Sequence, residues 1–355
     1  SLLIRLYNEA LAGADADRET LIPWSRGLRQ RFARGRDIAD QPALSRAMYR
    51  PFFKQLIFSS GPLVEVRGRV PGFFSGTDCK NIAIAFSTPK TDRPPGVLMV
   101  GQPTSLDLFG ATTRVAPLFT VGDTESDGLF GDKDAVANNI TDEVLTKFQA
   151  AYGSAVAKDD IFFYVYGLLH SSDYRETYAA DLKKMLPRIP LVDDAQPFID
   201  AGCKLSELHL GYESVEPYPL EGLDAQPADG QDPYAFYAVG DKKMRFGKPS
   251  PEQKAAGQRH DHSTIQYNGR ITLSGIPEEA YRYMLGSRSA VEWIIDRYYI
   301  KTDKASGIVN DPNDWSKEVG DPRYIIDLLA RIVTVSLETM RIVDALPPLA
   351  IREVQ

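Results

Sequence analysis

Cysteine and histidine are scarce in this sequence, with two and four copies among 355 residues. Cys79 and Cys203 lie far apart, which excludes a disulfide framework and suits two buried structural thiols in a reducing cytoplasm. His260 and His262 are the only histidines close together in sequence, and they fall in a polar segment without further short-spaced ligands. Because a zinc site needs several such ligands, we expect no metal centre.

Long apolar runs are also absent. No stretch approaches the ~20 apolar residues that cross a membrane. The first residues lack the basic leader and the cleavage pattern of a signal peptide. The sequence begins at Ser1 without a methionine and enters at once on an apolar, helix-like pattern. We therefore expect a cytoplasmic protein and a segment cut from a longer polypeptide.

The motifs of several enzyme classes are missing as well. An amino-methyltransferase needs an Asp/Asn-Pro-Pro-aromatic loop to hold its target amine, and the sequence contains none. It contains neither G-x-G-x-x-G nor G-x-x-x-x-G-K-[ST], the turns that hold dinucleotides and nucleoside triphosphates. The Pro-Asp…Glu-x-Lys pattern of metal-dependent nucleases and the G-x-S-x-G of hydrolases are absent too. The sequence thus predicts a domain without a catalytic centre or cofactor of its own.

Positive charge is in deficit overall but unevenly placed. The net charge of −7 argues against nucleic-acid binding when it is taken alone. Residues 24–69, however, contain ten basic and three acidic residues, and residues 242–270 contain seven and two. Residues 193–241 contain eleven acidic residues and one basic residue. We expect the first two segments to form one continuous positive face, with the acidic segments on the opposite side or rim.

The spacing of apolar residues predicts an α+β fold of mixed short strands and helices, with a helical C-terminal part. Prolines and acids at 213–233 predict a long loop or a boundary between two lobes. Residues 264–273 predict a hairpin with the two-residue turn Asn268-Gly269. Further short strands are expected at 56–58, 63–66, 81–86 and 97–100, and helices at 141–153, 159–170, 171–187, 277–286, from Ser287 onward and at 321–347.

Basic and amide side chains gather around the predicted hairpin. Lysine carries a flexible point charge suited to phosphate, whereas Arg, Asn and Gln carry planar groups that pair with base edges. A two-stranded ribbon can also enter a DNA groove. The simpler alternative is an exposed hairpin beside a solvated basic loop. The predicted DNA-binding residues are Lys242, Lys243, Arg245, Lys248, Arg259, Gln266, Asn268 and Arg270, with Arg50 and Lys54 as phosphate contacts upstream.

Three stretches carry more information than these patterns do. They run from Leu44 to Gln55, from Phe163 to Pro190 and from Ser289 to Asn313. Together they resemble the C-terminal specificity region of type ISP restriction–modification enzymes, over nearly the whole chain. The last stretch is specific to that family, whereas the middle one is shared with related single-chain enzymes that methylate and cut DNA. Aromatic residues at helical spacing in the middle stretch are expected in the core rather than at bases.

The resemblance implies a place within a larger enzyme. In that family one polypeptide carries a nuclease, a DNA-translocating ATPase, a coupler, an adenine-N6 methyltransferase and then the recognition domain. Residues 1–60 would connect to, or end, the methyltransferase, and residues 61–355 would form the target-recognition domain. Double-stranded DNA and the upstream methyltransferase are the implied partners. S-adenosylmethionine, ATP and Mg are the cofactors implied for the full-length enzyme.

Two functions from different classes follow from this reasoning. The first is sequence-specific recognition of double-stranded DNA, which positions the methyltransferase, motor and nuclease on a short target. The alternative is a protein-interaction scaffold that docks on the motor or methyltransferase without reading DNA. Specific duplex binding distinguishes the two. A third possibility, a free-standing hydrolase with an unfamiliar site, has no motif to support it.

Overall fold

The structure is a computed structural model. It describes residues 2–12, 22, 24–38, 43–59, 73–74, 81–88, 95–121, 136–304 and 307–352. The strand predicted at 63–66 and the predicted buried thiol of Cys79 lie outside these ranges.

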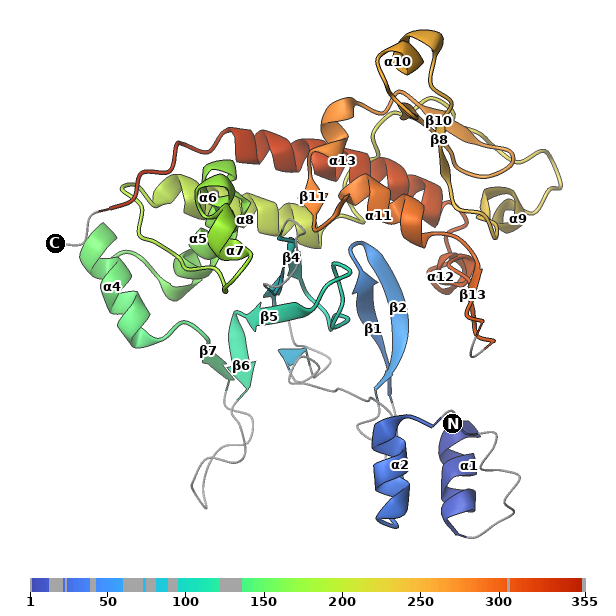
Figure 1. The fold of residues 1–355 in the computed structure, drawn as a ribbon, viewed down its shortest axis with the longest axis horizontal. Coiled ribbons are helices and arrows are strands. Elements are labelled where there is room, and N and C mark those ends of the chain that lie inside the picture. The colour runs from blue at the N-terminus through green and yellow to red at the C-terminus, as the bar shows by residue number, and fades with distance from the viewer. Residues whose placement is uncertain are drawn as a thin grey trace.

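The described chain combines helices with small antiparallel sheets, which confirms the α+β class and the helical C-terminal part (Figure 1). The helices are α1 (Leu2–Leu11), α2 (Arg26–Ala33), α4 (Asp142–Tyr152), α5 (Lys158–His170), α6 (Ser172–Thr177), α7 (Ala179–Leu182), α8 (Gln196–Leu210), α9 (Pro233–Tyr237), α10 (Pro251–Ala255), the 3-10 helix η2 (Glu278–Tyr281), α11 (Ala290–Arg297), α12 (Asn313–Glu318) and α13 (Tyr324–Asp344). The strands are β1 (Ala43–Arg50), β2 (Phe53–Ser59), β3 (Ala83–Ser87), β4 (Val97–Val100), β5 (Thr113–Pro117), β6 (Phe119–Val121), β7 (Val136–Asn138), β8 (Arg245–Gly247), β9 (Asp261–Gln266), β10 (Thr272–Ser274), β11 (Met284–Leu285), β12 (Arg288–Ser289), β13 (Lys301–Thr302) and β14 (Val309–Asn310).

A three-stranded sheet in the order β4-β3-β5 lies between two hydrophobic cores. Successive side chains of a strand point to opposite faces of its sheet. On β3, Ala83 and Ala85 pack into the core shared with α11 and α13, whereas Ile84 packs into the core shared with α5 and α8. The strand β4 alternates in the same way. A strand buried on both faces must be apolar throughout, which explains the continuous Val-Leu-Met-Val sequence of β4.

Two glycines set the close packing of α5 against α8. A Cβ atom added to Gly167 would lie 2.1 Å from the carbonyl oxygen of Phe198. One added to Gly202 would lie 1.9 Å from the carbonyl oxygen of Phe163. Real Cβ atoms do not approach backbone this closely, so the two helix backbones touch only because neither position carries a side chain.

A chain of buried hydrogen bonds joins β4, α5, α8 and α13. The Tyr166 hydroxyl accepts from the backbone N–H of Met99 at 2.7 Å and lies 2.6 Å from Nδ1 of His209. The Nε2 atom of His209 lies 2.9 Å from the Thr339 hydroxyl. Because the Tyr166 proton is free to go to Nδ1, we assign the other nitrogen as the one that donates to Thr339. Burial of the ring lowers the pKa of His209 to about 3, so the imidazole is neutral.

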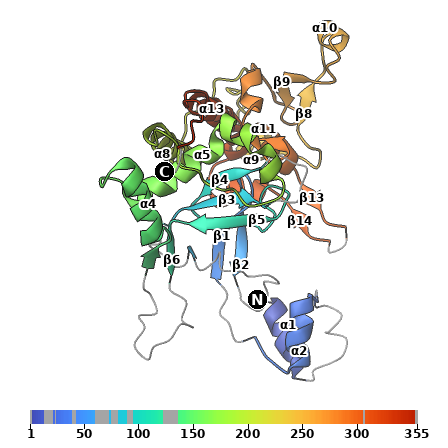
Figure 2. The same ribbon diagram turned by 60° about the vertical axis from the view of Figure 1, so that its left-hand side comes forward.

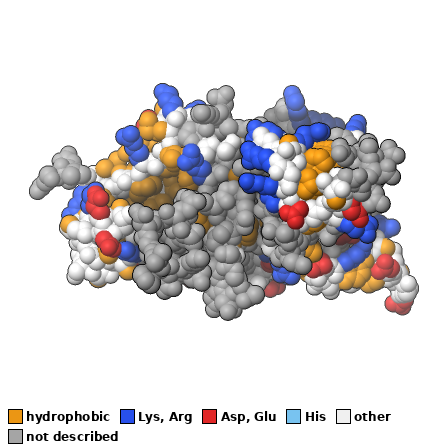
Figure 3. Space-filling view, turned by 90° about the horizontal axis from the view of Figure 1, so that it is seen from below, with side chains coloured by type: hydrophobic (Ala, Val, Ile, Leu, Met, Phe, Trp, Pro, Cys, Tyr) orange, Lys and Arg blue, Asp and Glu red, His pale blue; other side chains and the backbone are white. Residues whose placement is uncertain are grey.

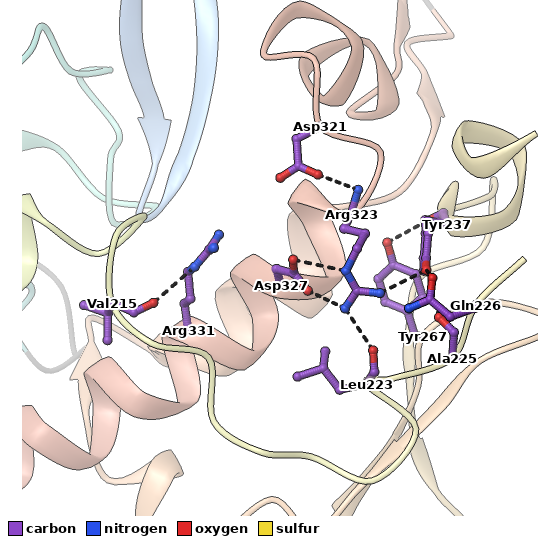
Figure 4. A network of polar contacts seen from close by, with 10 residues as sticks. All are labelled: Val215, Leu223, Ala225, Gln226, Tyr237, Tyr267, Asp321, Arg323, Asp327 and Arg331. Carbon is purple, nitrogen blue, oxygen red and sulfur yellow. Dashed lines mark hydrogen bonds and ion pairs between the residues drawn. The ribbon is translucent and has the colours of Figure 1, made fainter.

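The proline-rich, acidic segment 213–232 lies along α13 as an extended loop, as its composition predicts. Arg331 donates from Nε to the Val215 carbonyl at 3.1 Å, and Arg323 donates from Nη2 to the Leu223 carbonyl at 2.9 Å (Figure 4). Arg323 is itself held by Asp327 at 2.7 Å. Arg323, which caps α13, and Arg331 within that helix thus hold two carbonyl groups of this irregular segment.

The helices α1 and α2 form a separate small cluster below the main body (Figure 2). Tyr7, Trp24 and Phe32 pack ring against ring, with centroids 5.0–6.1 Å apart. The side chain of Asn8 bonds to both backbone groups of Ile38, at 2.9 and 3.0 Å. This pair therefore has its own core. The predicted divisions of the chain near residue 60 and at 213–233 stay predictions.

Several predicted elements are confirmed by the structure. Thr141 caps α4 and Gly153 ends it, α5 closes at His170, and α13 runs up to the residues before Pro347. The predicted tyrosine core is also confirmed for Tyr164, Tyr166 and Tyr174, which are at most 1% exposed.

Other predicted elements are wrong in detail. The helix expected at 171–187 is two short pieces, α6 and α7. The helix expected at 277–286 is the short η2 followed by the β11–β12 hairpin, because Gly286 turns the chain at a φ of 74°. The cap of the next helix is Ser289 rather than Ser287. No helix in the described part of the chain is both long and apolar enough to cross a membrane.

We expect Gly167→Ala or Gly202→Ala to lower the free energy of unfolding by about 3 kcal/mol. The new Cβ atom meets backbone, which no side-chain rotation can move away. Urea denaturation would measure the loss. Gly240→Ala is the matched control, since a Cβ atom there meets nothing within 4 Å. Equal losses in all three variants would contradict this account of the α5–α8 contact.

The buried His209 should make stability depend on pH. Its folded pKa lies near 3, whereas an unfolded histidine titrates near ~6.5. Between these values the unfolded chain binds more protons, so the free energy of unfolding falls as pH falls, by up to ~1.4 kcal/mol per pH unit for one histidine.

The variant His209→Gln keeps an acceptor for Tyr166 and a donor for Thr339 but cannot titrate. In this variant, unfolding at acid pH should take up about one proton fewer than in the wild type. Urea denaturation at a series of pH values measures this difference. The exposed His260→Gln is the control and should leave the dependence as it is. A wild-type slope in His209→Gln would show that this ring does not carry the effect.

Candidate DNA interface

The predicted DNA-binding segment forms an arm at one corner of the molecule (Figure 1). Its sheet has the order β10-β9-β8, with α10 between β8 and β9. Ser250 caps α10 and completes a capping box with Gln253, and Gly257 ends the turn at a φ of 81°. Ile265 and Leu273 anchor the base of the arm in the core. Proline, serine and glycine thus build a short, well-defined tip from few residues.

Five of the predicted cations lie exposed on or beside the arm: Lys242, Arg245, Lys248, Arg259 and Arg270. Lys243 is also exposed, but it forms an ion pair with Asp296 and lies 5.2 Å from the ring of Tyr299. Arg270 donates from Nη1 to the Ala235 carbonyl at 3.2 Å. The structure therefore brings the predicted phosphate and base contacts of residues 242–270 onto one projecting element.

The predicted hairpin is confirmed, but its turn is longer than two residues. Tyr267 pairs with Ile271, so Asn268, Gly269 and Arg270 form the loop. Both amide protons of Asn268 go to the carbonyls of Phe236 and Ala238. Its side-chain oxygen accepts from the backbone of Arg270 and Ile271. The amide of Asn268 is thus fully used in holding the turn, which leaves no group for a base.

Gln266 lies in the middle of the sheet, where its backbone pairs with Arg245 on one side and Thr272 on the other. Its side chain is only partly exposed. The two amides that the sequence suggested as base readers are therefore less available than the exposed cations of the arm.

The other predicted contacts, Arg50 and Lys54, lie on the β1–β2 ribbon near its tip. Phe52 at that tip has a φ of 58°, which is costly for an aromatic residue. It is fully buried, and its carbonyl accepts from the Tyr298 hydroxyl at 2.9 Å. The tip of the ribbon is thus inserted into the core. This insertion explains the Tyr-Arg-Pro-Phe-Phe-Lys-Gln sequence at 49–55.

Lys54 lies within this inserted tip. Its Nζ atom lies 2.5 Å from the carboxylate of Glu213, and its side chain is 16% exposed. Arg50 is half-buried, stacks 4.1 Å from the Tyr49 ring and donates to the Ser105 hydroxyl at 3.3 Å. Burial lowers the pKa of Arg50. Lys54 in particular is an internal cation. Its side chain lies within the fold and not on an outer surface that could face phosphates.

Asp296 lies at the centre of a group of cations that the sequence alone did not reveal. Its carboxylate pairs with Lys243, with Arg297 at 3.1 Å and with Arg288 at 3.7 Å. The two arginines also lie over the Trp293 ring, at 5.4 and 5.1 Å. One acid therefore neutralises part of the positive charge between α11 and the arm.

The expectation of one continuous positive face is wrong for the outer parts of the two basic segments. Figures 1 and 2 place α2 and α10 at opposite ends of the molecule. Seen from the end that carries α1 and α2, lysine and arginine side chains gather where these helices lie (Figure 3). The exposed arginines of α2 and of the residues directly after it are Arg26, Arg29, Arg34 and Arg36. The fold separates these two segments, and a count of charges along the sequence cannot predict where each of them lies.

An α+β body with an exposed cationic arm is typical of nucleic-acid-binding domains. The chain belongs to the family of Type ISP C-terminal specificity domains, whose model matches residues 3–328. The resemblance inferred from the sequence is therefore confirmed. None of the curated protein sequences matches the chain.

Solved structures give the same relationship. The chain is similar over 99% of its length to the ATP-dependent Type ISP restriction–modification enzyme LlaBIII bound to DNA, with 32% identity and a TM-score of 0.78. A nuclease-deletion mutant of the Type ISP enzyme LlaGI in complex with a DNA substrate mimic matches 99% at 33% identity and a TM-score of 0.74. A DrdV–DNA complex matches 99% at 30% identity and 0.77. The chain spans 21%, 26% and 33% of those chains.

We expect Lys54→Ala to lower the free energy of unfolding by about 1–3 kcal/mol, because Glu213 would lose its cation while still half-buried. Lys242→Ala is the control, since that lysine is exposed and has no ion pair among the described residues; its effect should stay within about 0.5 kcal/mol. Urea denaturation of both variants measures the difference. An equal, small effect would mean that Lys54 is a surface cation after all.

Proposed function

We propose that this chain recognises a specific sequence in double-stranded DNA, as the specificity domain of a larger restriction–modification enzyme. The observation that carries the proposal is the match of 99% of the chain to enzymes that were solved with DNA, at 30–33% identity. The exposed cations of the arm supply the electrostatic attraction that phosphates require.

The chemistry belongs to the rest of that enzyme. The chain covers at most 33% of the related chains, so most of each lies outside the matched domain. The absence of methyltransferase, nuclease and nucleotide-binding motifs from the sequence agrees with this division. S-adenosylmethionine, ATP and Mg would serve the upstream domains, and this chain would set where on DNA they act.

The β1–β2 ribbon is the surface that we assign to the upstream methyltransferase. Leu44, Leu56 and Ile57 are 66%, 44% and 37% exposed on it, although they are large apolar residues. Exposed apolar side chains of this kind favour a protein partner over a phosphate backbone. The ribbon also follows α1 and α2 directly in the sequence, and these two helices would connect it to the methyltransferase domain. The arm projects away from these helices and is left for DNA.

Binding selection on random duplexes tests the proposal directly. The chain should enrich one short, asymmetric sequence, and filter binding should then show at least ~10³-fold preference for it over random duplex. Equal binding to every duplex would leave only non-specific attraction. No binding at physiological salt would favour the scaffold that docks on the motor or methyltransferase without reading DNA.

The exposed lysines at the start of the arm should act as phosphate contacts. We expect Lys242→Ala and Lys248→Ala each to weaken binding to all duplexes alike and to lower the salt slope by about one unit. Lys184→Ala removes the same charge from an exposed position just after α7, away from the arm, and is the matched control. Filter binding over a range of salt concentrations measures the slopes. A change at one base position only, or an equal change in the control, would contradict this assignment.

A further inference from the structure

An open pocket of about 430 Å³ lies where the loop between α10 and β9 meets the start of η2. The side chains that line it include Gln258, Arg259, His260 and His262, with Asp261 and Glu278 also on its wall. From the sequence, no metal site is expected at His260 and His262. Their place in the fold gives them a different setting, because His262 lies on β9 and His260 directly before it, in the arm that carries α10 (Figure 1).

Some of the lining residues hold the backbone of the pocket in place. The Asp261 carboxylate accepts from the backbone and hydroxyl of Ser263, at 3.0 and 2.7 Å, and from Gln253 at 3.3 Å. These hydrogen bonds lower the pKa of Asp261. Gln253 also accepts from the Ser250 backbone at 2.7 Å. The loop between α10 and β9 is thus tied at both ends.

An aromatic wall stiffens the same loop. The His262 ring lies 4.4 Å from Phe246 and 5.3 Å from Tyr281, measured between centroids. His260 and His262 are nearly parallel, with planes 14° apart. The Tyr281 hydroxyl donates to the His262 carbonyl at 2.8 Å. Side chains on this loop are therefore presented from a fixed backbone, as recognition by planar groups requires.

Three neighbouring side chains on this fixed loop are available for contacts with a ligand. Gln258, Arg259 and His260 are exposed and form no side-chain hydrogen bond or ion pair with the described residues. Each carries a planar donor or acceptor group of the kind that pairs with base edges: Gln with adenine, Arg with guanine. Asp261 and Glu278 on the pocket wall would repel phosphate but can lie beside the amino groups of bases. The local chemistry favours a base edge over the backbone.

We propose that Gln258, Arg259 and His260 read base edges in the major groove of the target duplex, with Gln253, Asp261 and Tyr281 as positioning residues. The proposal rests on the proposed function and adds where the sequence is read. It transfers the base-reading role from Gln266 and Asn268, whose side chains are half-buried or fully used, to the loop that precedes β9. Lys248 and Lys254, which are exposed and precede this loop in the sequence, would hold phosphates beside it.

Binding of variants to a panel of duplexes tests the assignment. The panel contains the selected target and every single-base substitution of it, and the protein is the full 355-residue chain. Gln258→Ala and Arg259→Ala should each lose about 5- to 150-fold in affinity for the target, and their loss should vanish on duplexes substituted at one position. Gln258→Ala should leave the salt slope unchanged, because it removes no charge.

Lys254→Ala, on the helix α10 that precedes the loop, is the matched control. It should weaken binding to the whole panel evenly and lower the salt slope by about one unit. Thermal unfolding should be unchanged in all three variants, since the side chains removed are exposed. Even losses across the panel in Gln258→Ala and Arg259→Ala, or no loss at all, would overturn the assignment while leaving the proposed function intact. If the wild-type chain binds no duplex selectively, the proposed function and this assignment fail together.

Discussion

The contact between α5 and α8 is the constraint on which the rest of the structure depends. Gly167 and Gly202 let the two backbones touch, and this closeness brings Tyr166 and His209 within hydrogen-bonding distance of each other. From there the bonds reach β4 on one side and Thr339 of α13 on the other. Since α13 also fixes the loop 213–232 and packs against α11, one close approach determines the frame that carries the arm.

The arm combines a buried base with a free tip. Ile265 and Leu273 belong to the central core, and the Tyr267 hydroxyl bonds to the Tyr237 carbonyl at 2.7 Å. The tip beyond them, with α10, is held mainly by its own caps and turns. A reading loop needs this arrangement, because a planar side chain discriminates between bases only when the backbone beneath it is fixed.

The sequence predicts local features well, but it predicts poorly which distant segments contact one another. Thr141 and Gly153 mark both ends of α4 because a cap and a left-handed turn depend on one residue each. The sequence does not predict α8, because Gly202 lowers its helix propensity and is explained only by the close contact with α5. Asn268 and Lys54 have the right chemistry for DNA, but their partners lie 30 or more residues away in sequence and appear only in the folded chain.

The same distinction explains how an acidic chain can be suited to DNA. Net charge counts every lysine and arginine equally, whereas the fold gives some of them an internal acid: Glu213 for Lys54, Asp296 for Lys243 and Arg297. A cation already paired gains little from a phosphate, because it must first give up its partner. On the arm, the exposed Lys242, Arg245, Lys248, Lys254 and Arg259 form no ion pair with the residues that the structure describes. Attraction to DNA therefore depends on where unpaired charge lies, and a total of −7 is compatible with a strongly attractive arm.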